Sequence, residues 1–167
     1  MQLKVIGKPT KVSVAHCRKA LRYFAKRLLS KRLYRSLSIK LTFSPNLLVK
    51  GECIWTDSPQ LGRAYEINIR HNLGDRQMLL ALAHEMVHVM QWSKGLMKDY
   101  WRNPDITNWQ GKDYQFIEND DYWFSPWEIQ AYGLEKGLYE IYKKDLRNDS
   151  YRRRFNSSQR RSTYKRT

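Results

Sequence analysis

Residues 78–90 form an almost wholly apolar run that nevertheless contains two histidines and a glutamate. Such a run predicts a buried helix, and Gly95 is placed to end it. His84 and His88 are four residues apart, so on a helix they point the same way from neighbouring turns. Glu85 stands beside His84 on an adjoining face. Burying three such side chains without partners is costly, which indicates that they bind something together.

The segment from His84 to His88 has the pattern H-E-x-x-H, which is typical of zinc metallopeptidases. In that pattern both histidines bind the metal ion and the glutamate acts on a water molecule next to it. We therefore predict one Zn²⁺ ion at His84 and His88, with Glu85 as the general base. The alternative is a helix whose histidines are only hydrogen-bonded within the core.

A catalytic zinc site needs a third protein ligand. The two other histidines, His16 and His71, both precede the motif, so we expect a carboxylate instead. We prefer Glu128 because it stands in the first turn of the next predicted helix, which would hold a ligand rigidly. Alternatively, an acid at this position only complements the helix dipole. The rival carboxylates are Glu118, Asp120, Asp121 and Glu135.

Hydrophobic periodicity predicts most of the elements before the motif. Apolar residues at three- and four-residue steps predict an amphipathic helix over residues 12–35, whose other faces carry only basic charges. Alternating segments then predict three short strands, and their short connections favour antiparallel pairing. These strands are expected at residues 38–43, 52–56 and 65–70.

The motif helix is expected at about 75–93, with Asp75 as its cap. Residues 96–125 have no clear period and are rich in Trp, Tyr, Asn and Asp. They could form a lid whose aromatic residues line a substrate cleft, or a small hydrophobic cluster that holds the loop down. Ser125 is placed to cap a last helix that would end near residue 146.

The net charge of +15 is concentrated at the two ends of the chain. Residues 1–50 contain 13 Lys and Arg and no acid, and residues 147–167 contain 8 Lys and Arg and one acid. Residues 51–146, which hold the motif, have 10 bases and 15 acids. Such asymmetry predicts a nucleic-acid partner for the basic helix and the Arg-rich tail. The alternative for the helix is an ordinary solvated face.

With 167 residues, the chain is expected to form one domain over residues 1–146, followed by a basic tail at 147–167 that is disordered alone. No apolar stretch approaches the length of a membrane span, and the first residues lack a signal-peptide core. We therefore expect a cytoplasmic protein without a membrane partner. Cys17 and Cys53 are expected to be reduced thiols, although a disulfide between them is an alternative.

The chain resembles the small gluzincin-type zinc metallopeptidases, and also the SprT-like and ImmA/IrrE-like cytosolic proteins of bacteria and phages. The resemblance rests on residues 83–88 and 128–131, and as architecture it covers about 14–146. SprT-like proteins use a third histidine, which this chain lacks after its motif. The larger gluzincins usually place an acid four residues after the third ligand, where this chain has Tyr132.

The resemblance implies an α+β, zincin-like fold. It would contain an N-terminal helix, a small antiparallel three-stranded sheet, the H-E-x-x-H helix and a C-terminal helix that carries the third ligand. It also implies an endopeptidase in which Glu85 moves the proton and a further donor stabilises the oxyanion. Tyr132 is the first candidate donor because it shares the Glu128 face, and Tyr114 and Tyr122 are others.

Two functions therefore remain open. The first is a zinc endopeptidase that cuts proteins at or near nucleic acid, with strand 65–70 accepting the substrate as an added strand. The second is a nucleic-acid-binding or assembly protein with a structural zinc ion and no proteolysis.

Overall fold

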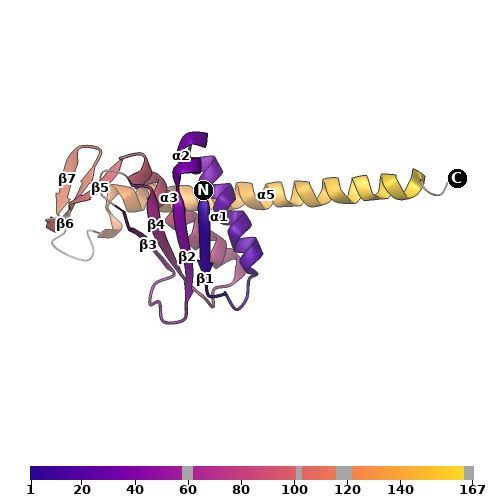
Figure 1. The fold of residues 1–167 in the computed structure, drawn as a ribbon, viewed down its shortest axis with the longest axis horizontal. Helices are drawn as coiled ribbons and strands as arrows, with labels where there is room; N and C mark the ends of the chain where they lie inside the picture. Colours follow the sequence, from indigo (N-terminus) through magenta and orange to yellow (C-terminus); the bar gives the residue numbers. More distant parts are fainter. Residues whose placement is uncertain (58–61, 101–102, 116–121, 164–167) are drawn as a thin grey trace.

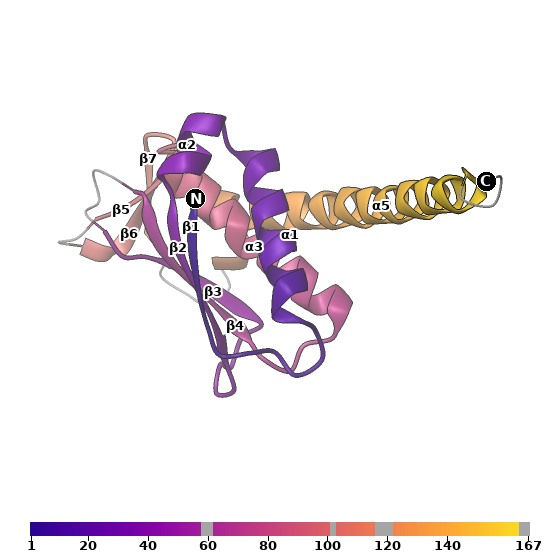
Figure 2. The same ribbon diagram turned by 45° about the vertical axis from the view of Figure 1, so that its right-hand side comes forward.

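The computed structural model describes residues 1–57, 62–100, 103–115 and 122–163. A mixed four-stranded sheet packs against α1 (Val14–Leu28) and α3 (Asp75–Ser93), and a smaller antiparallel sheet stands at one end of the molecule (Figure 1). Figure 2 shows both helices on the same face of the larger sheet. The predicted α+β class is confirmed.

The larger sheet has the order β1-β2-β4-β3. Its strands are β1 (Gln2–Ile6), β2 (Ser38–Ser44), β3 (Gly51–Trp55) and β4 (Ala64–Arg70). β1 and β4 both run parallel to β2, and only β3 is antiparallel to its neighbour β4. The predicted antiparallel three-stranded sheet is therefore wrong. Burial alternates along β2 and β4 whichever way their neighbours run, so periodicity could not reveal strand direction.

The helix predicted over residues 12–35 is two helices, because a second one, α2 (Lys31–Ser36), follows α1. Ser30 lies between them with an extended backbone, and its hydroxyl accepts a hydrogen bond from the backbone N of Leu33 at 3.3 Å. Serine is a strong N-cap, so it starts a new helix inside the apolar pattern. The buried face of α1 consists of Cys17, Ala20, Leu21, Phe24 and Ala25.

The motif helix α3 has the predicted bounds, but its cap differs. Gly74 is the N-cap and makes no side-chain hydrogen bond, so Asp75 does not cap the helix. Instead, the Asp75 carboxylate pairs with the Lys143 ammonium at 3.1 Å. Gly95 follows the helix with a φ of 71°, which confirms it as the expected stop.

Part of the segment that lacks a period forms the smaller sheet. Its strands are β5 (Met97–Tyr100), β6 (Asn103–Trp109) and β7 (Lys112–Gln115). Gln110 and Gly111 join β6 to β7 with φ values of 51° and 90°, as in a two-residue hairpin turn. Met97 and Trp109 are buried against Trp127, which confirms the alternative of a small hydrophobic cluster.

The last helix, α5 (Pro126–Thr163), continues well past residue 146, so its predicted end is wrong. Its first part is packed into the core through Ala131, Leu138 and Tyr142, and its C-terminal part projects away from the rest of the molecule (Figures 1 and 2).

Cys17 and Cys53 are free thiols, which rules out the disulfide. Among the described residues, no helix has the length and hydropathy needed to span a membrane.

Candidate metal centre

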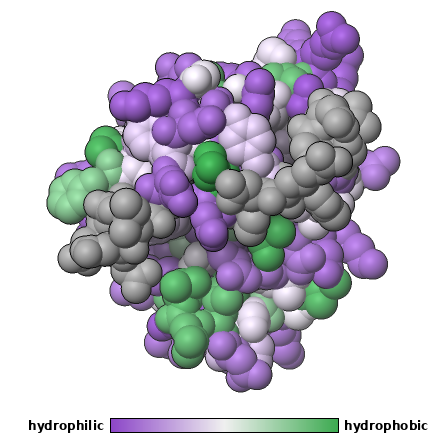
Figure 3. Space-filling model, turned by 90° about the vertical axis from the view of Figure 1, so that its left-hand side faces the viewer, coloured by the Kyte–Doolittle hydropathy of each residue, from purple (hydrophilic) through white to green (hydrophobic). Residues whose placement is uncertain are grey.

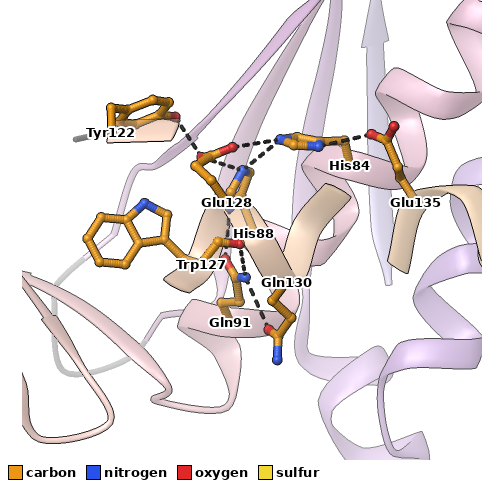
Figure 4. A network of polar contacts seen from close by, with 8 residues as sticks. All are labelled: His84, His88, Gln91, Tyr122, Trp127, Glu128, Gln130 and Glu135. Atoms are coloured by element: carbon orange, nitrogen blue, oxygen red, sulfur yellow. Dashed lines mark hydrogen bonds and ion pairs between the residues drawn. The ribbon is translucent and has the colours of Figure 1, made fainter. Parts of the chain in front are cut away.

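Three of the predicted site residues meet between α3 and the first turn of α5. The Nε2 atoms of His84 and His88 are each 3.2 Å from an oxygen of Glu128, and they are 3.1 Å from one another (Figure 4). Glu128 is almost completely buried, with 2% of its surface exposed. These ligand atoms therefore lie close enough to hold one metal ion.

The spacing of these atoms fits a tetrahedral metal ion. Bonds of about 2.0–2.1 Å, as zinc makes to imidazole and carboxylate, separate neighbouring ligand atoms by about 3.4 Å. The two Nε2 atoms are 3.1 Å apart, and each is 3.2 Å from a different oxygen of the Glu128 carboxylate, Oε2 for His84 and Oε1 for His88, so these separations are close to this value. Two imidazoles and one carboxylate are also a common donor set of catalytic zinc sites.

The imidazole rings are oriented by hydrogen bonds at their other nitrogen. His84 Nδ1 donates to Glu135 Oε2 at 3.0 Å, and His88 Nδ1 donates to Gln91 Oε1 at 2.8 Å. Gln91 is fixed in turn, because its amide nitrogen donates to the backbone oxygen of Trp127 at 2.9 Å (Figure 4). When a metal ion is bound, a proton on each Nδ1 would leave both Nε2 lone pairs directed at that ion.

The sequence did not reveal these orienting roles, although a signal was present. Glu135 is seven residues after Glu128, which places both on one face of α5, and Gln91 is three residues after His88 on α3. Glu135 was predicted only as a rival ligand. It contacts His84 from the side away from Glu128 and so supports the site without joining the three ligand atoms.

Tight packing brings the first turn of α5 to α3. Trp127 and Ala131 are buried on either side of Glu128, and the small Ala131 side chain permits close approach of the two helices. Ser125 precedes the helix, and its backbone oxygen accepts from the N–H of Ile129 at 3.0 Å. The predicted side-chain cap is not made, because the buried Ser125 hydroxyl has no hydrogen-bond partner among the described residues.

Without a bound metal ion, His84 and Glu128 favour opposite charges on one another, a protonated imidazole and an ionised carboxylate. Burial alone would lower the pKa of His84, but its hydrogen bonds to the Glu128 and Glu135 carboxylates outweigh burial and raise that pKa to about 9. Burial alone would raise the pKa of Glu128, but its contacts with both histidines and Tyr122 hold it far below the usual range. Glu128 is therefore ionised and available to a cation throughout the neutral pH range.

Glu85 lies beside this centre and faces β3. It is 4% exposed, and burial raises its pKa to about 7 despite the opposing charges of His88 and His84. A Cβ added to Gly51, the first residue of β3, would stand 2.6 Å from Glu85 Oε1, so only glycine allows this approach. A carboxylate with a pKa near 7 is well suited to accept and return a proton at neutral pH.

The centre opens onto a cleft of about 920 Å³. Its walls come from α3, from the loop before β3 and β3 itself, from the smaller sheet and from the start of α5. Met97, Asp99 and Thr107 contribute from the smaller sheet, so the segment that contains the hydrophobic cluster also lines the cleft.

The three candidate tyrosines occupy different positions. The Tyr132 ring packs edge-on against His84, with centroids 4.6 Å apart. The Tyr122 hydroxyl donates to Glu128 Oε1 at 2.6 Å, so this phenol contacts one of the three ligand residues directly (Figure 4). Tyr114 packs against Trp127 with centroids 5.8 Å apart, as part of the small hydrophobic cluster.

Replacement of Glu135 by alanine is expected to lower zinc affinity by about 10- to 100-fold, because the His84 imidazole loses the acceptor that orients it. Glu135→Gln keeps an oxygen acceptor and should recover most of this loss. Zinc affinity can be measured by competition with a chromophoric chelator. Glu140, an exposed acid on the same helix, provides the matched control, and equal affinities of Glu135→Ala and Glu140→Ala would contradict the orienting role.

The rival ligands Glu118, Asp120 and Asp121 lie outside the described residues. Among the described residues, His84, His88 and Glu128 are the group whose ligand atoms lie close enough to hold a metal ion.

Comparison of the chain with models of protein families, with curated proteins and with solved structures finds no match in any of the three. The functional assignment therefore depends on the chemistry of the centre.

Proposed function

We propose that this chain is a zinc-dependent endopeptidase. The observation that carries the proposal is the convergence of His84, His88 and Glu128 at a cleft of about 920 Å³, with the buried carboxylate of Glu85 beside them. Three protein ligands that open onto a cleft suit a catalytic ion better than a structural one, which is enclosed by four. The structural-zinc alternative is less favoured for this reason.

In this proposal the chain binds zinc through His84 Nε2, His88 Nε2 and the Glu128 carboxylate. A zinc ion bound there would supply Lewis-acid chemistry, polarising a carbonyl and making a water more acidic. Glu85 accepts the proton of the attacking water on its carboxylate and later donates it to the leaving amine. Tyr122 or Tyr132 provides a phenol for the developing oxyanion, and the Tyr122 O–H would have to leave Glu128, to which it donates, before it could serve.

The substrate backbone pairs with β3 in this proposal. The strand first expected to accept it, residues 65–70, lies inside the sheet as β4, between β2 and β3. β3 stands at the end of the strand order, begins at Gly51 next to Glu85, and lines the cleft. An extended peptide added to this edge would bring its backbone past the carboxylate that moves the proton.

Proteolysis should depend on metal and on an open coordination position. Chain stripped with a chelator is expected to lose activity on an unfolded protein substrate, and one equivalent of zinc should restore it. A peptide hydroxamate should inhibit the restored activity, because it binds through an open position. Zinc that binds stoichiometrically without hydrolysis or hydroxamate binding would favour the structural alternative.

The basic end of the chain supports a nucleic-acid partner in this proposal. Seven cations of α1 and α2 are exposed: Lys19, Arg22, Lys26, Arg27, Lys31, Arg32 and Arg35. A basic face of this kind attracts phosphates and would bring the peptidase to nucleoprotein targets.

Replacement of Arg22 and Arg27 by glutamine is expected to make the log–log slope of DNA affinity against salt shallower by about 2, because two phosphate contacts are lost. Binding can be followed by fluorescence anisotropy of a labelled duplex. The control replaces Lys94 and Lys98, which are exposed near the smaller sheet. An unchanged slope in the Arg22 and Arg27 variant would show that these two side chains of α1 do not contact DNA phosphates.

A further inference from the structure

Bulky apolar side chains are exposed on two walls of the cleft. On one wall Trp123 is 57% exposed, next to Tyr122 and just before α5. On the other, Leu48 is 91% exposed and Val49 is 52% exposed, just before β3. Figure 3 shows the end of the molecule that faces left in Figure 1, where hydrophobic residues stand among hydrophilic ones. Grouped exposure of this kind marks a surface that binds a partner.

The aromatic wall is continuous with the metal centre. The ring centroid of Trp123 is 6.1 Å from that of Tyr132, which is in turn 4.6 Å from that of His84. The Tyr122 ring contacts Trp123, with centroids 5.8 Å apart, while its hydroxyl reaches Glu128. A ligand that touches Trp123 is therefore adjacent to the metal ligands.

The aliphatic wall is held in place by hydrogen bonds from Arg70 at the end of β4. Arg70 Nε donates to the backbone oxygens of Leu47 at 2.9 Å and Val49 at 3.1 Å, and the Arg70 backbone N–H donates to Lys50 at 3.0 Å. These bonds fix the loop that presents Leu48. A surface that is organised in advance loses less conformational entropy when it binds.

From these two walls we infer the substrate class: extended, unfolded peptide segments that carry a bulky aliphatic or aromatic side chain next to the scissile bond. The inference rests on the proposed endopeptidase function. A strand paired with β3 turns alternate side chains to opposite sides, so every second side chain beside the centre would enter the cleft that Leu48 and Trp123 line.

The charge of the cleft favours a peptide over a nucleic-acid strand that stacks on the same aromatic residues. Among the described residues, five carboxylates line the cleft and its cations are Lys50 and Arg70. Even when the two charges of a bound zinc ion are counted, carboxylates outnumber positive charges in the cleft, so a phosphate backbone gains no attraction there, whereas the exposed cations of α1 and α2 lie elsewhere.

The test uses the full chain with Glu85→Gln, loaded with zinc, so that peptides bind without being cut. Two fluorescent peptides of polar residues differ only at the central position, which is Phe in one and Ala in the other. The Phe peptide is expected to bind about 10- to 100-fold more tightly, as burial of one aromatic side chain predicts. Adding Leu48→Ser or Trp123→Ser should reduce this preference to less than about 3-fold.

Ile6→Ser is the matched control, because Ile6 is an exposed apolar residue on β1, at the other edge of the sheet. It should leave the preference unchanged, and retained zinc stoichiometry verifies that each variant keeps its centre. Equal binding of the two peptides, no binding of either, or a preference that survives both cleft substitutions would overturn the inference. Displacement of the Phe peptide by a single-stranded oligonucleotide would also overturn it.

Cleavage by the unsubstituted chain separates this inference from the proposed function. If zinc-loaded protein cuts both peptides with equal kcat/KM, the endopeptidase stands and the apolar preference fails. If Glu85→Gln prefers the Phe peptide but the unsubstituted chain cuts neither, the cleft binds as inferred and the proposed function fails.

Discussion

Replacement of Glu85 by glutamine is expected to lower kcat by about 100- to 10,000-fold while zinc remains bound. The amide is nearly the same size as the carboxylate but cannot accept the proton of the attacking water. Zinc affinity should change little, because Glu85 is not among the three converging ligands. The measurement pairs single-turnover peptide cleavage with zinc stoichiometry from atomic absorption.

Glu52, which lies on β3 and also lines the cleft, offers a matched control. Its carboxylate accepts a hydrogen bond from Asn68 at 2.9 Å, and Glu52→Gln keeps an oxygen that can accept this bond. We expect Glu52→Gln to retain most of the activity. Retained cleavage by Glu85→Gln would show that another group moves the proton, and loss of zinc from that variant would make its inactivity uninformative about proton transfer.

Replacement of Glu128 by alanine is expected to abolish cleavage and to lower zinc affinity more than Glu135→Ala does. The loss predicted for Glu135→Ala is about 10- to 100-fold. The Glu128 carboxylate places one oxygen 3.2 Å from each imidazole, so its removal leaves a two-ligand site. The comparison with Glu135→Ala distinguishes a ligand from a residue that orients one. Chelator competition measures both variants on the same scale.

Glu140→Ala serves again as the control on α5. Zinc affinity unchanged in Glu128→Ala would show that another carboxylate completes the site, and Glu118, Asp120 and Asp121 would then be substituted in turn. His88→Ala should match Glu128→Ala in its loss of zinc, since both remove one of the three ligand atoms.

Local sequence patterns predicted the parts of this protein that depend on neighbours along the chain. The bounds of α3, its stop at Gly95 and the shared direction of His84 and His88 follow from helical periodicity and from glycine's left-handed conformation. The first turn of α5 was likewise expected to present Glu128. Each of these features is fixed within a few residues.

One of the errors concerns partners that are distant in sequence, and two are local. β3 takes the outer position in the larger sheet, so β4 lies next to β2 and runs parallel to it. The burial pattern of a strand does not depend on whether its neighbour is parallel or antiparallel, so the sequence pattern could not show this. The hairpin of β6 and β7 was missed because β7 is mostly exposed and buries no regular set of residues. The break between α1 and α2 was missed because the apolar pattern continues through it. The only local signal is Ser30, which caps α2.

The sequence by itself determined the donor set: two imidazoles on neighbouring turns, a glutamate beside them and a carboxylate at the start of a later helix. Only the tertiary structure decided that α3 and α5 pack closely enough to bring those donors within 3.2 Å, and that Glu135 and Gln91 orient the rings. It also placed β3, and not β4, at the edge of the sheet beside Glu85. The physical reason is that periodicity records which side of an element is buried, whereas the identity of the element packed against that side depends on contacts between distant parts of the chain.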